Sequence, residues 1–164
     1  MYHQLREDYP KMPWRKLTFN NYVVPRWGFI LNLALQPRLH TKDKVAGCGS
    51  MIDQTCELCK EENETMQHLF FECKVTREVW ERLLKWQGIQ RSLMTWDEEV
   101  ELASKEMEGK TQKAEVYRMT LASCIYYIWI ERNSRIFKAK SQQVDGILRA
   151  LVQDIFREAI GKLR

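Results

Sequence analysis

Four residues near the middle of the chain combine side-chain types and spacing that suit metal binding. They follow the pattern C-x2-C-x8-H-x4-C, and they are Cys56, Cys59, His68 and Cys73. The two residues between the first cysteines allow a tight turn that directs both sulfurs at one point. Three thiolates and one neutral imidazole complete a tetrahedral shell, and soft sulfur ligands favour Zn²⁺ over Mg²⁺ or Ca²⁺. The pattern therefore predicts one structural zinc ion as the cofactor.

A closed shell of four protein ligands leaves no coordination position for water. We therefore expect the zinc ion to stabilise the fold, and we expect no enzymatic activity. On a continuous helix, His68 and Cys73 would point about 140° apart, at about 100° per residue. The helix that carries His68 is thus predicted to end before Cys73, which folds back to the metal.

Two other interpretations of the cysteines stay open at this stage. In one, the motif is two unrelated thiol pairs with a core histidine; in the other, Cys48 replaces one of the ligands. Cys124 lies within an apolar stretch, and we interpret it as a small buried side chain. Five cysteines without a secretory signal favour metal ligation or buried thiols over a disulfide framework.

Helices are predicted on both sides of the zinc motif. Before it, the apolar stretch 27–35 is predicted to be a buried helix that ends at Pro37. Thr41 is predicted to cap a short second helix. After the motif, apolar residues recur at helical spacing over 75–86, and Gly88 is the predicted stop.

Three further helices are predicted in the C-terminal half. Thr95 and Glu98 form a capping box at the start of a polar helix that ends near residue 108. Thr111 opens the longest periodic stretch, whose apolar residues cluster on one face at about 100° per residue. The last helix follows Ser141. Because neither of the last two amphipathic helices is stable alone in water, we predict that they pack as an antiparallel pair.

Arg132 stands out because it falls on the apolar stripe of the long helix. A buried guanidinium must be paired or hydrogen-bonded, and arginine is rarely buried without a partner. We therefore predict that a carboxylate or backbone carbonyls hold Arg132 and that its role is structural.

The fold class follows from these patterns. No stretch of convincing length alternates apolar and polar residues, so the chain is predicted to be mostly α. We expect a small helical domain with an irregular structural zinc segment and a C-terminal antiparallel helix pair. The 164 residues are 45% hydrophobic, which is ordinary for a globular protein and excludes wholesale disorder.

The sequence was also searched for a membrane-spanning run and for the apolar core of a signal peptide. No apolar run approaches the roughly 20 residues that a membrane span needs. The first residues contain no apolar signal-peptide core, so an intracellular, reducing location is predicted, and the choice between nucleus and cytoplasm stays open.

Charge is distributed unevenly along the chain. Residues 1–45 carry a net charge of +5, residues 46–110 carry −6 and residues 111–164 carry +5, within a total of +4. Basic blocks on both sides of an acidic middle suit a nucleic-acid partner, because lysine and arginine contact phosphates. A charged residue content of 29% also fits an ordinary solvated surface.

Several runs of this sequence resemble the zinc-binding domain that follows the reverse transcriptase in plant LINE-type (non-LTR) retrotransposons. The runs around the zinc motif are 55–59 (TCELC), 64–73 (ETMQHLFFEC) and 79–80 (VW). The segments 39–45 (LHTKDKV) and 125–137 (IYYIWIERNSRIF) are similar to the segments that flank this domain. The resemblance covers the chain from about residue 14 to about residue 137.

The resemblance implies an all-α zinc module at the C-terminal end of a retroelement polyprotein, where it contacts element RNA or target DNA during copying. The chain shows no aspartate pair in a strand-turn setting, so polymerase catalysis is not implied. We predict a reverse-transcriptase-type zinc-binding domain over residues 1–90 and a helical C-terminal extension over residues 91–164.

Two functions are consistent with these features. The first is a non-catalytic zinc-binding module that contacts RNA or DNA through basic surfaces. Its candidate phosphate contacts are Arg15, Lys16, Arg26, Arg135, Lys138 and Lys140. The alternative is a stand-alone protein-interaction or scaffold module derived from a retroelement, without nucleic-acid binding, because the glutamates around the zinc motif would repel phosphate. We predict neither a membrane nor a small-molecule substrate among the partners.

Overall fold

The computed structural model describes residues 24–49, 51–105 and 111–162, and most of these residues are helical. The elements in chain order are α2 (Pro25–Leu35), α3 (Lys42–Gly47), η1 (His68–Glu72), α4 (Lys74–Trp86), α5 (Trp96–Lys105), α6 (Gln112–Phe137) and α7 (Val144–Lys162). The element η1 is a π-helix. Among the described residues, the one β contact is an isolated antiparallel bridge between Thr55 and Asn63. The predicted mostly α fold class is confirmed.

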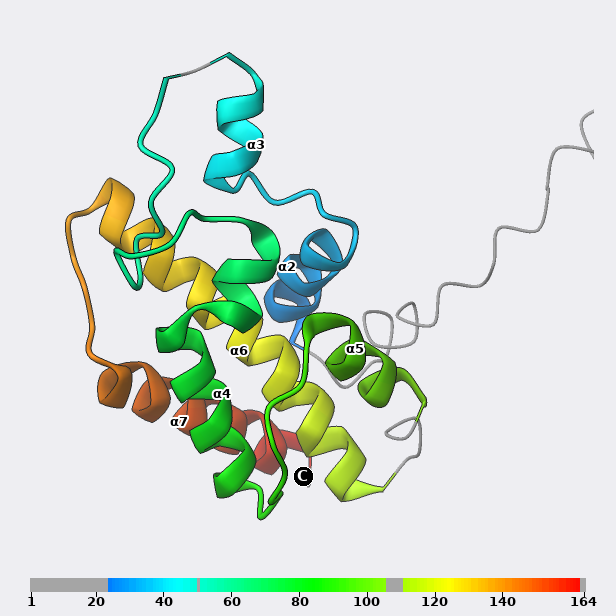
Figure 1. The fold of residues 1–164 in the computed structure, drawn as a ribbon. Helices are drawn as coiled ribbons and strands as arrows, with labels where there is room; N and C mark the ends of the chain where they lie inside the picture. The colour runs from blue at the N-terminus through cyan, green and yellow to red at the C-terminus, as the bar shows by residue number, and fades with distance from the viewer. Residues whose placement is uncertain (1–23, 50, 106–110, 163–164) are drawn as a thin grey trace, which may run out of the picture.

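Helix α6 is the central element of the fold (Figure 1). It packs against α2, α4, α7 and η1, so it contacts elements from both ends of the described chain. Every residue from 117 to 125 of this helix is buried. Burial thus extends beyond the single apolar face that the periodicity predicts, because neighbouring elements cover α6 on several sides.

Helices α6 and α7 form the predicted antiparallel pair. Near the end of α6, Arg135 Nη2 donates to the carbonyl of Gln142, just before α7 begins. Farther back along α6, the Tyr127 hydroxyl donates to Asp154, in the middle of α7. Residues nearer the start of α6 thus contact residues farther along α7, so the two helices are antiparallel. Helix α7 also packs against α4, so the pair is one side of a larger helical core.

Two of the predicted helix starts have the expected capping geometry. The Thr95 backbone N–H donates to Glu98 Oε2 at 2.8 Å, and the Glu98 N–H donates back to Thr95 Oγ1 at 3.3 Å, which is a capping box. Thr111 Oγ1 accepts from the Ala114 N–H at 3.2 Å at the start of α6. Helix α5 is described as far as Lys105, so its predicted end near residue 108 lies outside the described residues.

The start of α3 differs in detail from the prediction. Thr41 precedes the helix as expected, but its hydroxyl donates to Asp43 Oδ1 and accepts no helix N–H.

Pro25 occupies the first turn of α2, which therefore starts two residues before the predicted range 27–35. Proline is tolerated there because its missing N–H would have no partner within the helix.

Apolar side chains from five of the elements meet in one core. Trp27, Phe70, Leu83, Ile125 and Leu151 come from α2, η1, α4, α6 and α7, and each is at most 1% exposed. The long helices thus bury their apolar residues against one another. Within the described residues, no helix has both the length and the apolar character required to cross a bilayer.

Candidate metal centre

The first two cysteines lie at the closed end of a short hairpin. The bridge between Thr55 and Asn63 joins its two arms, and the Cys56 N–H donates to the Glu62 carbonyl at 2.7 Å. Between the arms, the Lys60 N–H donates to the Cys56 carbonyl at 2.9 Å, and Lys60 has a φ of 59°. This left-handed residue closes the tight turn that holds both sulfurs on one side.

A π-helical turn joins the other two ligands. The Cys73 N–H donates to the His68 carbonyl at 2.7 Å, a bond between residues five apart. Such a turn is wider than an α-helical turn and places the sixth residue close to the first. Cys73 itself is extended, with φ −60° and ψ 129°. The prediction that the helix ends before Cys73 is confirmed, whereas the π-helical widening was not predicted.

The four ligands converge on one point and all four are buried. Cys56 Sγ, Cys59 Sγ, Cys73 Sγ and a ring nitrogen of His68 lie within 4.8 Å of one another, and Cys59 Sγ lies 3.4 Å from His68 Nε2. Tetrahedral zinc places sulfur and nitrogen ligands roughly 3.6 Å apart and two sulfurs roughly 3.8 Å apart. The donor set and its spacing therefore fit one zinc ion held by four protein ligands. Cys48 is exposed and lies outside the cluster.

Backbone N–H groups point at two of the sulfurs. Leu58 and Cys59 donate to Cys56, while Val75 and Thr76, in the first turn of α4, donate to Cys73. Without a cation, the hydrogen bond to Cys73 and then burial raise the pKa of Cys56, and the hydrogen bond from Cys56 lowers the pKa of Cys73. The N–H donors oppose the cost of burial because they favour the thiolate form that binds zinc.

Aromatic packing holds η1 against the helices. Phe71 lies with its ring centroid 4.8 Å from that of Trp96 and 6.5 Å from that of Trp80. The Thr76 hydroxyl donates to the Leu69 carbonyl at 2.6 Å and ties α4 to η1. Leu69, Phe70 and Phe71 are buried, so the side chains that follow His68 are packing residues of the core.

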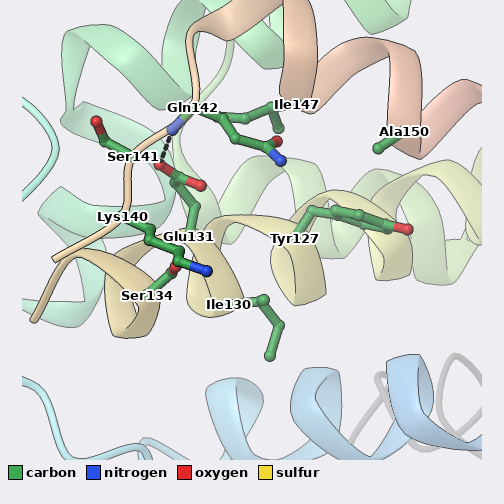
Figure 2. Close-up of a pocket in the computed structure, with 9 residues that line it drawn as sticks. All are labelled: Tyr127, Ile130, Glu131, Ser134, Lys140, Ser141, Gln142, Ile147 and Ala150. Carbon is green, nitrogen blue, oxygen red and sulfur yellow. Dashed lines mark hydrogen bonds between the residues drawn. The ribbon is translucent and has the colours of Figure 1, made fainter. Parts of the chain in front are cut away.

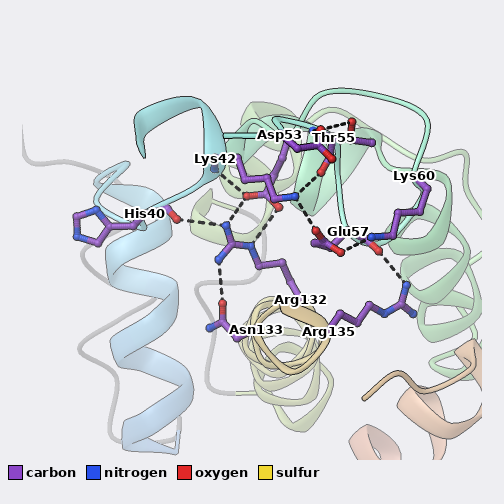
Figure 3. A network of polar contacts seen from close by, with 10 residues as sticks. His40, Lys42, Asp53, Thr55, Glu57, Lys60, Arg132, Asn133 and Arg135 are labelled. Carbon is purple, nitrogen blue, oxygen red and sulfur yellow. Dashed lines mark hydrogen bonds and ion pairs between the residues drawn. The ribbon is translucent and has the colours of Figure 1, made fainter. Parts of the chain in front are cut away.

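A network of charged residues supports the hairpin from the side of α6 (Figure 3). Arg132 Nη2 lies 2.7 Å from Glu64 Oε1, and its Nε lies 3.1 Å from Glu64 Oε2. Glu64 Oε1 also accepts from the Lys42 N–H at 2.9 Å, and Lys42 Nζ donates to the Thr55 carbonyl at 2.7 Å. The predicted pairing of a buried Arg132 with a carboxylate is confirmed. Its partner was not predicted, because Glu64 lies in a polar run with no signal of burial.

The basic residues selected from the sequence have different surroundings. Arg15 and Lys16 lie outside the described residues. Arg26 is exposed, 3.8 Å from Asp154. Lys138 and Lys140 are exposed beyond the end of α6, whereas Arg135 is partly buried and donates to protein acceptors. Among these candidates, Arg135 contacts the zinc hairpin through the Glu57 and Leu58 carbonyls, while Lys140 lines a pocket at the start of α7.

Fold and site together define a small helical module organised around one structural zinc ion. Residues 1–80 match the family described as zinc-binding in reverse transcriptase. This part of the chain is therefore a reverse-transcriptase zinc-binding domain, as its residues suggested. Searches of the curated proteins and of the solved structures returned no match to the chain.

Proposed function

We propose that this zinc module binds RNA or DNA through the face at the C-terminal end of α6, without catalytic activity. The observation that carries the proposal is a pocket of about 510 Å³ between the segment 40–57 and the end of α6. Trp129 and Phe137 line it, and Phe137 is 77% exposed. Exposed Lys138 follows directly in the chain. Aromatic rings beside lysines are the usual means of holding a single strand, because bases stack on the rings while cations contact the phosphates.

Ion pairing in the structure weakens the main objection to this proposal. The sequence places several glutamates near the zinc motif, and unpaired glutamates would repel phosphate. Glu57 contacts Lys42 and Lys60, Glu61 contacts Lys74, and Glu64 is buried against Arg132. Ion pairing reduces the repulsion that these three glutamates would exert on a phosphate near the end of α6.

The salt dependence of binding tests the phosphate contacts. We expect the affinity for a short single-stranded RNA or DNA, measured by fluorescence anisotropy, to fall as salt rises. The double variant Lys138→Ala/Lys140→Ala should reduce the slope of log affinity against log salt by about 1.4, at about 0.7 per contact. Lys113→Ala removes an exposed lysine at the opposite end of α6 and should leave the slope unchanged. Affinity that does not depend on salt would contradict the proposal.

The role of the aromatic ring is tested separately. Phe137→Ala should weaken binding by about 1–3 kcal/mol and leave the salt slope unchanged, because stacking involves no counterion release. Phe156→Ala, which removes an exposed phenylalanine from α7, is the matched control. Equal affinity of the Phe137 variant and the parent would exclude stacking at this ring.

A second candidate function is supported by a different surface. Trp86, Phe156 and Ile160 are 40%, 54% and 51% exposed, and the rings of Trp86 and Phe156 lie 6.1 Å apart between centroids. Exposed aromatic anchors of this kind favour a protein partner. Co-purification of a protein from nuclease-treated extract, lost in Trp86→Ala/Phe156→Ala and retained in Phe137→Ala, would favour this scaffold function over nucleic-acid binding.

A further inference from the structure

Arg135 of α6 contacts the turn that carries the first two zinc ligands. Its Nη1 donates to the carbonyl of Glu57 at 3.1 Å and to the carbonyl of Leu58 at 3.2 Å. Figure 3 shows the Arg135 side chain reaching from α6 toward this turn. Both carbonyls lie between Cys56 and Cys59, so the guanidinium touches the backbone of the ligand turn and no ligand atom.

The same two peptide units also face the metal site. The peptide that carries the Glu57 carbonyl carries the Leu58 N–H, and the peptide that carries the Leu58 carbonyl carries the Cys59 N–H. Both of these N–H groups donate to Cys56. Arg135 and the Cys56 sulfur thus lie at opposite ends of two peptide dipoles. Hydrogen bonds in such a chain strengthen one another, because each polarises the next.

Arg135 is itself held in a fixed orientation. Its Nε donates to Glu131 Oε1 at 2.9 Å, and its Nη2 donates to the Gln142 carbonyl at 3.2 Å. The Gln142 N–H donates to the same Glu131 oxygen at 2.7 Å, as Figure 2 shows beside the pocket at the start of α7. The side chains of Arg135 and Glu131 are only 18% and 7% exposed. Because two acceptors hold its Nε and Nη2, the guanidinium presents Nη1 to the ligand turn with little freedom.

We propose that Arg135 is a positioning residue for the zinc site. It aims two peptide N–H groups at Cys56 Sγ and fixes the turn between the first two ligands. Groups that orient ligands from outside the coordination shell commonly change metal affinity 10–100-fold, in order of magnitude. Arg135 lies outside the matched residues 1–80. Full zinc affinity therefore depends on α6 as well as on the segment that contains the ligands.

The test is zinc affinity of the full chain, measured by competition with a chromophoric chelator, together with the visible spectrum of the Co²⁺-loaded protein. Arg135→Ala should lower zinc affinity by about 10–100-fold. It should also alter the Co²⁺ bands, because they report the geometry of the ligand sulfurs. Lys138→Ala removes a nearby positive charge that contacts no ligand turn, and its affinity should stay within about twofold of the parent.

A second control separates positioning from general stability. Leu121→Ala creates a cavity in the buried part of α6, roughly 20 Å along the helix from Arg135. We expect it to lower the unfolding midpoint and leave the Co²⁺ spectrum unchanged. Parent-like zinc affinity and Co²⁺ bands in Arg135→Ala would overturn the proposal, and so would an equal loss of affinity in Lys138→Ala.

If the Arg135→Ala variant does not fold, Arg135→Lys tests the positioning role instead. Lysine keeps the charge but lacks the planar fork that serves Glu131, Gln142 and the ligand turn together. We expect a zinc affinity that is several-fold below that of the parent, with shifted Co²⁺ bands. A folded lysine variant with the zinc affinity and Co²⁺ spectrum of the parent would overturn the proposal.

Discussion

Arg132 and Glu64 show how one buried charge depends on a distant partner. Their side chains are 6% and 0% exposed, and they are 68 residues apart in the chain. The guanidinium also lies over the Trp129 ring, 4.8 Å from its centroid. Removing either charge leaves the other in a medium that solvates it poorly.

Arg132→Leu is therefore expected to destabilise the zinc-loaded protein by about 3–5 kcal/mol, because Glu64 would stay buried without its counter-charge. Urea denaturation at a fixed free-zinc concentration measures the loss. The double variant Arg132→Leu/Glu64→Gln should recover part of it, since glutamine removes the charge and still accepts from the Lys42 N–H. Parent-like stability of the single variant would show that the pair contributes little.

The five cysteines are expected to differ sharply in reactivity. Cys48 is exposed and should be alkylated first. Burial, followed by the nearby Glu99 charge, raises the pKa of Cys124 to about 12, so its thiol should stay unmodified in the folded protein. The three ligand cysteines should become reactive only after chelation. Mass spectrometry of alkylated peptides, with and without a chelator, checks this order, and early labelling of Cys124 would contradict its burial.

At the scale of elements, short segments acquire their shape from local bonds and their position from packing. The capping box at Thr95 starts α5, and Trp96 in its first turn packs on Phe71 beside the zinc site. Farther along α5, the fully buried Glu99 accepts from Trp80 Nε1 at 3.2 Å and from the Tyr117 hydroxyl at 2.9 Å. A helix of ten residues is thus held by its cap and by contacts to α4 and α6.

Thr95→Ala tests the contribution of the cap. We expect a loss of about 1 kcal/mol in unfolding free energy, because one orphan N–H of α5 loses its acceptor. Thr95→Ser retains the hydroxyl and should stay within a few tenths of a kcal/mol of the parent. Chemical denaturation of the three proteins compares these values, and equal stability of the alanine variant would mean that solvent replaces the cap.

At the scale of the whole molecule, α6 connects the zinc segment to the remaining helices. Its C-terminal part contacts the zinc hairpin through Arg132 and Arg135, while Tyr127 joins it to α7. The segment that carries the ligands has little apolar core of its own between Cys59 and His68. Zinc ligation and the contacts to α6 therefore stabilise the conformation of this polar loop.

Zinc removal is expected to loosen this part of the molecule first. A chelator should lower the thermal midpoint and speed hydrogen exchange in residues 54–73 more than in the core of α6. Cys59→Ser, which removes one ligand, should reproduce the effect, whereas Cys48→Ser should not. Circular dichroism and hydrogen-exchange mass spectrometry measure the two effects, and an unchanged midpoint after metal removal would contradict a structural role for zinc.

Local signals in the sequence were sufficient for the ligands, the helix starts at Thr95 and Thr111, and the antiparallel pair of α6 and α7. The ligands and the helix starts depend on spacing within a few residues, and the helix pair follows from two apolar faces that must be covered. The π-helical turn was missed because its i to i+5 bond serves the ligand geometry and leaves no mark in apolar periodicity. The division of the chain near residue 90 stays a prediction.

By itself, the amino-acid sequence determined the zinc ligands, the mostly α fold and the need for a partner of Arg132. Only the tertiary structure decided that this partner is Glu64 and that Arg135 reaches carbonyls 77 and 78 residues away. The physical reason is that ligand chemistry and helical periodicity are short-range properties of the chain. The burial of a charge depends instead on which distant surfaces come together when α6 packs against the zinc segment.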